Sequence, residues 1–504
     1  MKSRARNLSW CVAAAALAFL SETGVRAQTG GVPLWTNYYK GGPGLHASPR
    51  DLAVDTSGNV FVTGFALVDF PPGDFATVKY SGAGVPLWTN RFSGPGYTAT
   101  TLSIAVDSNG NAFVAGRSIG SCATIKCSGA GVPLWTNYLG GFAIGGVAVD
   151  NGGKVFVTAT TANYGSPAGD YVTAAYSSAG APLWTNYYNG PENLNDHIRS
   201  MAVDGNGNVV VTGVSARRFA TIKYSGAGVA LWTNRYDAPQ GDHDVASAVV
   251  VDGSGNAFVT GSSGSAGVTI KYSSAGVPLW TRVFSGGTIG GLEAATLDSS
   301  GSLYVAGSVQ NSVTGSNDFL TLKYSAAGVP LWTNRYDGPE GIHDSATSIA
   351  TDAGGNVFVF GDSVYHEDGY IYSVSFTTLA YSSEGVPLWT NRYESPPITL
   401  TTAMAVDGSG NVFVLGDTFL SYVTIKYSSA LPWLTTINRT ATSMVIVWPS
   451  SLTSFTLQEN TDLNQASNWS NVSAGVQDDG TTKTLVVSPV SGNRFYRLTR
   501  FVGN

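Results

Sequence analysis

Three neighbouring pairs of histidine and aspartate are the side chains of this sequence that most readily suggest chemistry. They are Asp196–His197, His243–Asp244 and His343–Asp344, and each aspartate lies eight residues before the Asp of a recurring Asp-x-x-Gly segment. Imidazoles and carboxylates at matched positions could bind a metal or a polar ligand. In the alternative reading, each Asp caps its own loop and each His is solvated. We favour this second reading, because positions related by a repeat need not converge in space.

An insertion at residues 363–375 is the second candidate. It mixes aromatic with acidic side chains, namely Tyr365, His366, Glu367, Asp368, Tyr370 and Tyr372. Tyrosine offers a large apolar surface with a polar tip, and carboxylates accept hydrogen bonds from hydroxyls, so such a loop suits sugar or protein recognition. The plain alternative is an irregular surface loop without a ligand.

The Asp-x-x-Gly segments predict turns. The Asp can accept backbone N–H bonds within its own turn, and the Gly can adopt a positive φ. A calcium loop needs several carboxylates, whereas the segment from Asp252 to Asn256 supplies one. The sequence therefore gives no reason to expect a metal or a cofactor.

Eight tandem repeats must position these residues. Leu-Trp recurs with Trp at 35, 88, 135, 184, 232, 280, 332 and 389, and Asp-x-x-Gly begins at 55, 107, 150, 204, 252, 298, 352 and 407. The fifth copy predicts four strands, at residues 249–252, 256–261, 268–273 and 277–282. Four strands in about 50 residues, joined by tight glycine-containing turns, are typical of one propeller blade.

The order of the elements predicts that the ring closes through the N-terminus. The first copy begins with a lone fourth strand, Val32 to Tyr39, and the eighth copy ends after its third strand near Tyr427. Pairing these two strands removes exposed sheet edges. We therefore expect an all-β, eight-bladed propeller over residues 28–430. Its turns between strands one and two and between strands three and four are uniform, whereas the other loops vary and emerge together on one face, here called the variable face.

The string from Ala53 to Gly64, and its counterpart from Ala405 to Val414, resembles the bacterial β-propeller repeat family often labelled SBBP. The resemblance covers residues 30 to 429. It implies a secreted or surface propeller, mostly without an assigned activity, and the family's usual picture is seven blades where eight copies are counted here.

Residues 431–504 lack the repeat. Strands are predicted at 443–448, 454–458, 483–487 and 494–498, with Trp448 and Trp469 as core anchors. The segment looks like a small immunoglobulin- or fibronectin-like sandwich of the kind that ends many bacterial exported proteins.

The first 27 residues have the composition of a signal peptide: a basic start, an apolar stretch from Trp10 to Leu20, and Val25-Arg26-Ala27 before the cleavage point. The whole chain has a net charge of −6; removal of four basic residues and one acidic residue with this leader leaves −9. That balance disfavours nucleic acid and anionic membranes as partners. No later segment is long enough for a membrane span.

The sequence therefore predicts a secreted or cell-surface protein that binds without catalysis, with a glycan or another surface protein as partner on the variable face. The rival prediction is an extracellular polysaccharide hydrolase or lyase that uses Asp and His residues at the mouth of the central channel. Both readings place function on the variable loops, where repeat scaffolds usually carry it.

Overall fold

The computed structural model falls into two compact units, one comprising Gly30–Leu431 and the other containing Pro432–Asn504. It describes residues 31–42, 46–67, 73–93, 100–118, 121–141, 143–161, 169–238, 243–338, 343–367, 370–394, 400–418, 421–428, 436–439, 444–449, 455–460, 469–472, 475–478, 482–487 and 495–500. The predicted leader lies outside this described part. All regular elements within it are strands, so no helix there is long and apolar enough to cross a membrane.

Each repeat folds as a four-stranded antiparallel sheet, as the sequence predicts, with its strands hydrogen-bonded in chain order. The first three sheets contain β2 (Ala47–Val54), β3 (Val60–Leu67), β4 (Gly73–Tyr80) and β5 (Pro86–Phe92); β6 (Thr100–Val106), β7 (Ala112–Ser118), β8 (Ser121–Cys127) and β9 (Pro133–Gly140); β10 (Ala143–Val149), β11 (Val155–Thr160), β12 (Tyr171–Tyr176) and β13 (Pro182–Tyr188). The next two contain β14 (Asp196–Val203), β15 (Val209–Ser215), β16 (Arg218–Tyr224) and β17 (Ala230–Tyr236); β18 (Asp244–Val251), β19 (Ala257–Ser263), β20 (Ala266–Tyr272) and β21 (Pro278–Phe284).

The sixth and seventh repeats share one eight-stranded sheet. Their strands are β22 (Ile289–Leu297), β23 (Leu303–Gln310), β24 (Asn317–Tyr324) and β25 (Pro330–Tyr336); β26 (His343–Thr351), β27 (Val357–Glu367), β28 (Tyr370–Tyr381) and β29 (Pro387–Tyr393). The two halves are joined through the parallel partners Asn317 and His343 alone. Each half is therefore equivalent to one of the separate four-stranded sheets.

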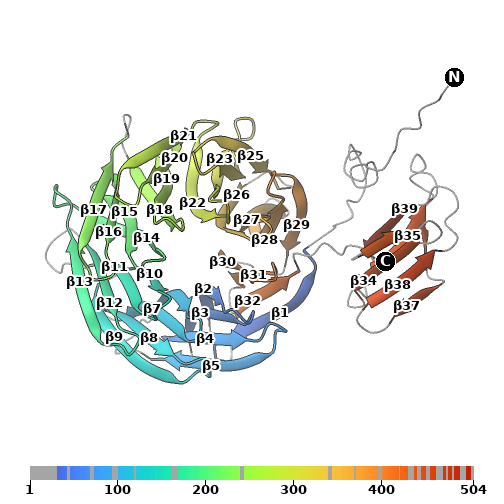
Figure 1. Cartoon of the computed structure of the whole chain (residues 1–504), viewed down its shortest axis with the longest axis horizontal. Coiled ribbons are helices and arrows are strands. Elements are labelled where there is room, and N and C mark those ends of the chain that lie inside the picture. Colours follow the sequence, from blue (N-terminus) through green and yellow to red (C-terminus); the bar gives the residue numbers. More distant parts are fainter. Residues whose placement is uncertain are drawn as a thin grey trace. The chain divides into compact units, whose positions relative to one another are not determined.

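The last sheet contains both ends of the repeat region, which confirms the predicted pairing. Strands β30 (Leu400–Val406), β31 (Val412–Asp417) and β32 (Ser421–Tyr427) are completed by the N-terminal strand β1 (Pro33–Lys40). Strand β1 runs antiparallel to β32, from Pro33 opposite Tyr427 to Lys40 opposite Ser421. Figure 1 shows β1, in blue, beside β32, in orange.

The first strand of every repeat contacts the first strand of the next. This series runs β2, β6, β10, β14, β18, β22, β26 and β30, and β30 in turn contacts β2. These strands face the centre of the arrangement in Figure 1. The core lies between neighbouring sheets; one cluster joins Val60 and Val78 of the first repeat to Phe413, Leu415 and Tyr422 of the last.

A clasp of side chains joins neighbouring sheets, and the first repeat shows all three of its members. In the first repeat, the indole N–H of Trp88 and the ammonium of Lys79 both donate to the carbonyl oxygen of Gly129, at 3.1 and 3.2 Å. The Asn90 amide donates to Gly131 of the same turn. The indole bond recurs for Trp35, Trp135, Trp184, Trp232, Trp280 and Trp332, each toward the turn of the following repeat.

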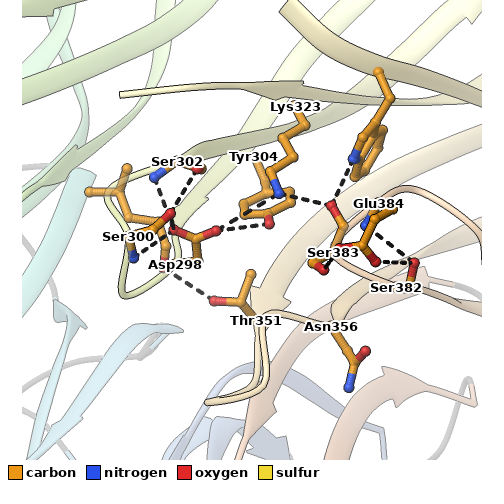
Figure 2. A network of polar contacts seen from close by, with 12 residues as sticks. Asp298, Ser300, Ser302, Tyr304, Lys323, Thr351, Asn356, Ser382, Ser383 and Glu384 are labelled. Carbon is orange, nitrogen blue, oxygen red and sulfur yellow. Dashed lines mark hydrogen bonds and ion pairs between the residues drawn. The ribbon is translucent and has the colours of Figure 1, made fainter. Parts of the chain in front are cut away.

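The receiving turn is shaped for the tryptophan. Gly131 has a φ of +85°, and a Cβ at that position would lie 2.7 Å from the Trp88 ring, so a glycine is required there on both counts. The Lys of the clasp also approaches the Asp of its own Asp-x-x-Gly turn. Figure 2 shows this arrangement for Lys323, which donates to Ser383 at 2.8 Å and lies 4.0 Å from Asp298.

The C-terminal unit contains two small antiparallel sheets. One comprises β33 (Thr436–Arg439), β34 (Met444–Pro449), β38 (Thr482–Val487) and β37 (Val476–Asp478); the other comprises β36 (Ser470–Asn471), β35 (Phe455–Asn460) and β39 (Phe495–Arg500). The four strands expected from the sequence are all present. Ile446, Trp448, Leu457 and Leu485 form a core that draws on both sheets, so Trp448 is an anchor as predicted. Trp469 is only partly buried.

Deleting residues 31–40 should greatly destabilise the repeat region. The deletion removes the ladder with β32 together with the bonds from Trp35 and Asn37 to the first repeat. Loss of a single buried aromatic costs about 3–5 kcal/mol, and here the ladder bonds are lost as well. Urea unfolding followed by tryptophan fluorescence measures the effect; deletion of residues 432–504 is the control. An unchanged transition after the N-terminal deletion would contradict the role of β1 in closure.

Candidate functional site at the centre of the ring

The three candidate aspartates cap their own loops. Oδ2 of Asp196 accepts the Gly190 N–H at 2.7 Å, and Asp344 accepts the Gly338 N–H at 2.6 Å. Asp244 accepts the N–H of Ala238 at 3.0 Å in the same way. All three carboxylates are buried, and burial raises the pKa of Asp196 and Asp344. Each of the three carboxylates therefore holds the loop that precedes its strand.

The neighbouring histidines point away from the aspartates. Successive side chains of a strand face opposite sides, and His197 is exposed beside the buried Asp196 on β14. His343 is likewise exposed beside Asp344, and its Nδ1 accepts the N–H of Asn317 at 3.3 Å. The His and Asp side chains of these pairs therefore do not face one another. Among the described residues, no group of three or more His, Cys, Asp or Glu side chains could hold a metal ion.

The insertion of the seventh repeat differs from the predicted irregular loop. Strands β27 and β28 continue as a hairpin whose ladder reaches Glu367 opposite Tyr370, whereas β26 leaves β27 at Val364. The side chains of residues 365–373, and Asp368 as a whole, lie outside the described part of the chain. The sequence carried a signal for the hairpin in Asp368-Gly369, a dipeptide that favours tight turns between β-prone runs.

Each innermost strand contains a β-bulge at one level of the ring, a feature that the sequence analysis missed. The extra residue opposes no partner of its own on the second strand, which turns its side chain out of the regular alternation. The register shifts identify these residues as Arg50, Leu102, Gly145, Arg199, Ser247, Glu293, Thr347 and Thr402. They differ widely in charge and size, although the repeats around them are alike.

The centre of the ring is open to solvent at this level and carries charge. Arg199 and Glu293 are exposed although they lie on innermost strands. Partial enclosure raises the pKa of Glu293, and the positive charge of Arg199 acts in the opposite direction. Arg50 has no hydrogen-bond or ion-pair partner for its buried Nε among the described residues. The bulges therefore set two guanidinium groups and one carboxylate on the inner side of the ring.

The opposite face, formed by the tight turns, is nearly free of charge. The two central residues of each Asp-x-x-Gly turn are Ser, Thr, Asn, Gly or Ala. A lysine of the same repeat offsets the charge of the turn Asp; in the fifth repeat, Lys271 lies 3.5 Å from Asp252. Among the turns between strands three and four in the first seven repeats, Glu384 is the charged exception. By contrast, the variable face has ion pairs such as Arg218–Glu192 and Arg218–Asp237, at 2.6 and 2.9 Å.

Comparisons with known proteins support a propeller fold. A family model described as an SBBP β-propeller repeat matches residues 87–121. The C-terminal WD40 domain of Sif2 is similar in structure, with 9% identity and a TM-score of 0.51, over 77% of this chain and 97% of that one. The Dos1 propeller has 9% identity and a TM-score of 0.50, over 79% of this chain and 94% of that one. No curated protein sequence matches the chain. The protein is an all-β propeller.

The carboxyl group beside the first bulge should make stability depend on pH. Asp51 accepts the N–H groups of Leu52 and Ile104 at 2.8 and 2.9 Å, so it joins the first two repeats. Burial raises its pKa from 3.8 to about 6. The folded protein therefore holds this proton more tightly than the unfolded chain, and the associated stability is lost as the pH rises through about 6.

We accordingly expect Asp51→Asn to remove this component. The free energy of unfolding is measured in urea at pH 4, 5, 6 and 7. The value for the wild type should fall relative to the value for Asp51→Asn as the pH rises. Asp237→Asn, at an exposed position, is the control. A constant difference between wild type and Asp51→Asn across these pH values would refute the assignment.

Proposed function

We propose that this protein is an exported, eight-bladed propeller that binds a ligand without catalysis on its variable face. The observation that carries the proposal is the division of chemistry between the two faces. One face is built from uniform, almost uncharged turns, and the other combines ion pairs, exposed histidines and the projecting hairpin β27–β28. Binding function on repeat scaffolds usually lies in such variable segments.

The flanking segments fit an extracellular setting. Residues 1–27 have the composition of a signal peptide. Residues 431–504 contain two small antiparallel sheets, as expected of a small immunoglobulin- or fibronectin-like sandwich. Trp448 belongs to the core to which both sheets contribute. A glycan or another surface protein is the proposed partner. The acidic net charge argues against nucleic acid.

The rival function, a polysaccharide hydrolase or lyase, rested on Asp and His residues acting together. Asp244 and Asp344 are instead engaged by loop backbone and turned away from His243 and His343. A general acid or base must come within hydrogen-bond reach of substrate, and a capping carboxylate is held away from it. The geometry of these residues therefore favours binding over turnover.

An array of bacterial and plant polysaccharides tests the proposal directly. The expected result is binding by the full-length protein without release of reducing or unsaturated ends. Turnover that is abolished by Asp244→Ala or Asp344→Ala would overturn the proposal in favour of the enzyme. Binding to none of the polysaccharides and to no surface protein would overturn it as well.

Shortening the hairpin should separate binding from folding. Residues 365–373 lie beyond the last partner on β26 and pair only with one another, so replacing them with a two-residue glycine turn removes no inter-sheet ladder bond. We expect the melting temperature to stay within about 2 °C and affinity for the polysaccharide to fall at least tenfold. Replacing Tyr365, Tyr370 and Tyr372 with Ser is the matched control, because it keeps the backbone length. Unchanged affinity in both variants would exclude the hairpin as a binding element.

A further inference from the structure

Two of the bulge residues are arginines, and both have a buried tyrosine from the preceding repeat beneath them. Tyr422 precedes Arg50 around the ring, and Tyr171 precedes Arg199. A Cβ at Gly64 would lie 2.7 Å from the Tyr422 hydroxyl and 2.6 Å from Cα of Pro49, the residue before Arg50. The hydroxyl of Tyr422 therefore lies against the bulge itself.

The second constellation repeats the first. A Cβ at Gly213 would lie 2.8 Å from the Tyr171 hydroxyl and 2.9 Å from Cα of Ile198, the residue before Arg199. Both tyrosines are 1% exposed, and neither hydroxyl has a hydrogen-bond partner among the described residues. Two repeats that are not neighbours thus carry the same arrangement of arginine, bulge and buried hydroxyl.

The other six repeats show that the fold does not demand a hydroxyl here. The position occupied by Tyr171 and Tyr422 begins the buried part of the third strand, five residues before its last aromatic or cysteine. It is Phe75, Cys122, Phe219, Gly267, Phe319 and Phe376 elsewhere, and the bulges that follow those residues carry Leu102, Gly145, Ser247, Glu293, Thr347 and Thr402. Tyrosine accompanies arginine, and arginine only.

A buried hydroxyl without a partner destabilises the fold, so it requires an explanation. Phenylalanine would fill the same space at no such cost, as it does in four other repeats. Burial also raises the pKa of Tyr171 and Tyr422 well above the ordinary value, and the charges of Asp196 and Asp417 add to this rise. Nearby arginines, Arg199 and Arg50 among them, act in the opposite direction. Both phenols stay protonated and are able to donate.

Each arginine makes a site that offers donors, and the protonated tyrosine beneath it adds no negative charge. A guanidinium has five N–H donors and no acceptor, and it matches the geometry of carboxylates and of tetrahedral oxyanions. No carboxylate is paired with Arg50 among the described residues, whereas Arg199 shares the ring's centre with Glu293. The ligand that satisfies such a site supplies negatively charged oxygen atoms.

We propose that the centre of the ring binds an anionic ligand through Arg50 and Arg199, whose bulges lie against the buried hydroxyls of Tyr422 and Tyr171. The ligand is a carboxylate- or sulfate-bearing molecule such as an acidic oligosaccharide. This inference rests on the proposed binding function and names the chemistry of its ligand. Arg50 is the stronger of the two contacts, because Glu293 offsets the charge of Arg199.

Isothermal titration calorimetry of the full-length protein tests the proposal at constant ionic strength. The probes are sodium sulfate, glucuronate, a galacturonic acid tetramer and the neutral galactose tetramer. The variants are Arg50→Gln, Arg199→Gln, Tyr422→Phe and Tyr171→Phe. Arg217→Gln, at an exposed turn of the variable face away from the bulges, is the matched control.

We expect the acidic tetramer, and not the neutral one, to bind the wild type. Arg50→Gln should weaken binding at least tenfold, Arg199→Gln and Tyr422→Phe severalfold, and Arg217→Gln should have no effect. Tyr422→Phe and Tyr171→Phe should leave the melting temperature of the ligand-free protein unchanged or higher, since the hydroxyl lacks a partner there. Sulfate binding that matches the tetramer would identify a single oxyanion subsite as the source of affinity, and stronger binding of the tetramer would identify an acidic saccharide.

Two results would overturn the inference. One is affinity for the acidic probes that is unchanged in both arginine variants. The other is a melting temperature lowered by several degrees in both tyrosine variants with unchanged affinity, which would make the hydroxyls structural. If the wild type binds neutral polysaccharides on the array and none of the acidic probes, this inference fails while the proposed binding function stands. Binding of neither class contradicts both.

Discussion

The contact of tryptophan, lysine and asparagine with one carbonyl-rich turn is the interaction on which the remaining structure depends. The turn that follows the third strand of each repeat receives the clasp of the preceding repeat, and a few residues later the same segment supplies its own Trp and Asn to the next. One short segment of each repeat therefore accepts the clasp of the preceding repeat and supplies the Trp and Asn of the next clasp. Because the receiving glycine leaves space for the indole ring, the spacing between sheets is fixed at every junction.

In a row of such junctions, the last clasp needs a receiving turn and the first turn needs a clasp. The clasp of the seventh repeat needs a turn to receive it, and the Asn391 amide donates to Gly31, just before β1. Strand β1 then offers Trp35 to Gly82 of the first repeat, and Lys426 of the last repeat donates to the same oxygen. One strand therefore completes the last sheet and both of its junctions. Closure by the N-terminus follows from the polarity of the clasp as well as from edge pairing.

The sequence predicts the features that depend on local spacing and misses those that depend on register. Turn aspartates, four strands per repeat and the pairing of β1 with β32 follow from residue types at fixed intervals. The first strand was expected at residues 249–252 in the fifth repeat, but β18 begins at Asp244. Its bulge at Ser247 interrupts the alternation of apolar and polar residues, so the periodicity that marks a strand stops there. The arginine positions became comparable between repeats only once that register was known.

The same bulge explains where a function can vary without loss of the fold. Clasp residues face the neighbouring sheet, and the buried Val and Phe residues of strands two and three fill the space between sheets, so each substitution there disturbs two repeats. A bulge residue opposes no ladder partner, and Arg199 and Glu293 are exposed to solvent at the centre. Charge at that position therefore costs the fold little, provided that the residue beneath it fits. Phenylalanine fits at this position in four other repeats, so fit alone does not explain the tyrosine beneath Arg50 and Arg199. The extra hydroxyl lies against the bulge of the next repeat, so its effect falls on the strand segment that carries the arginine.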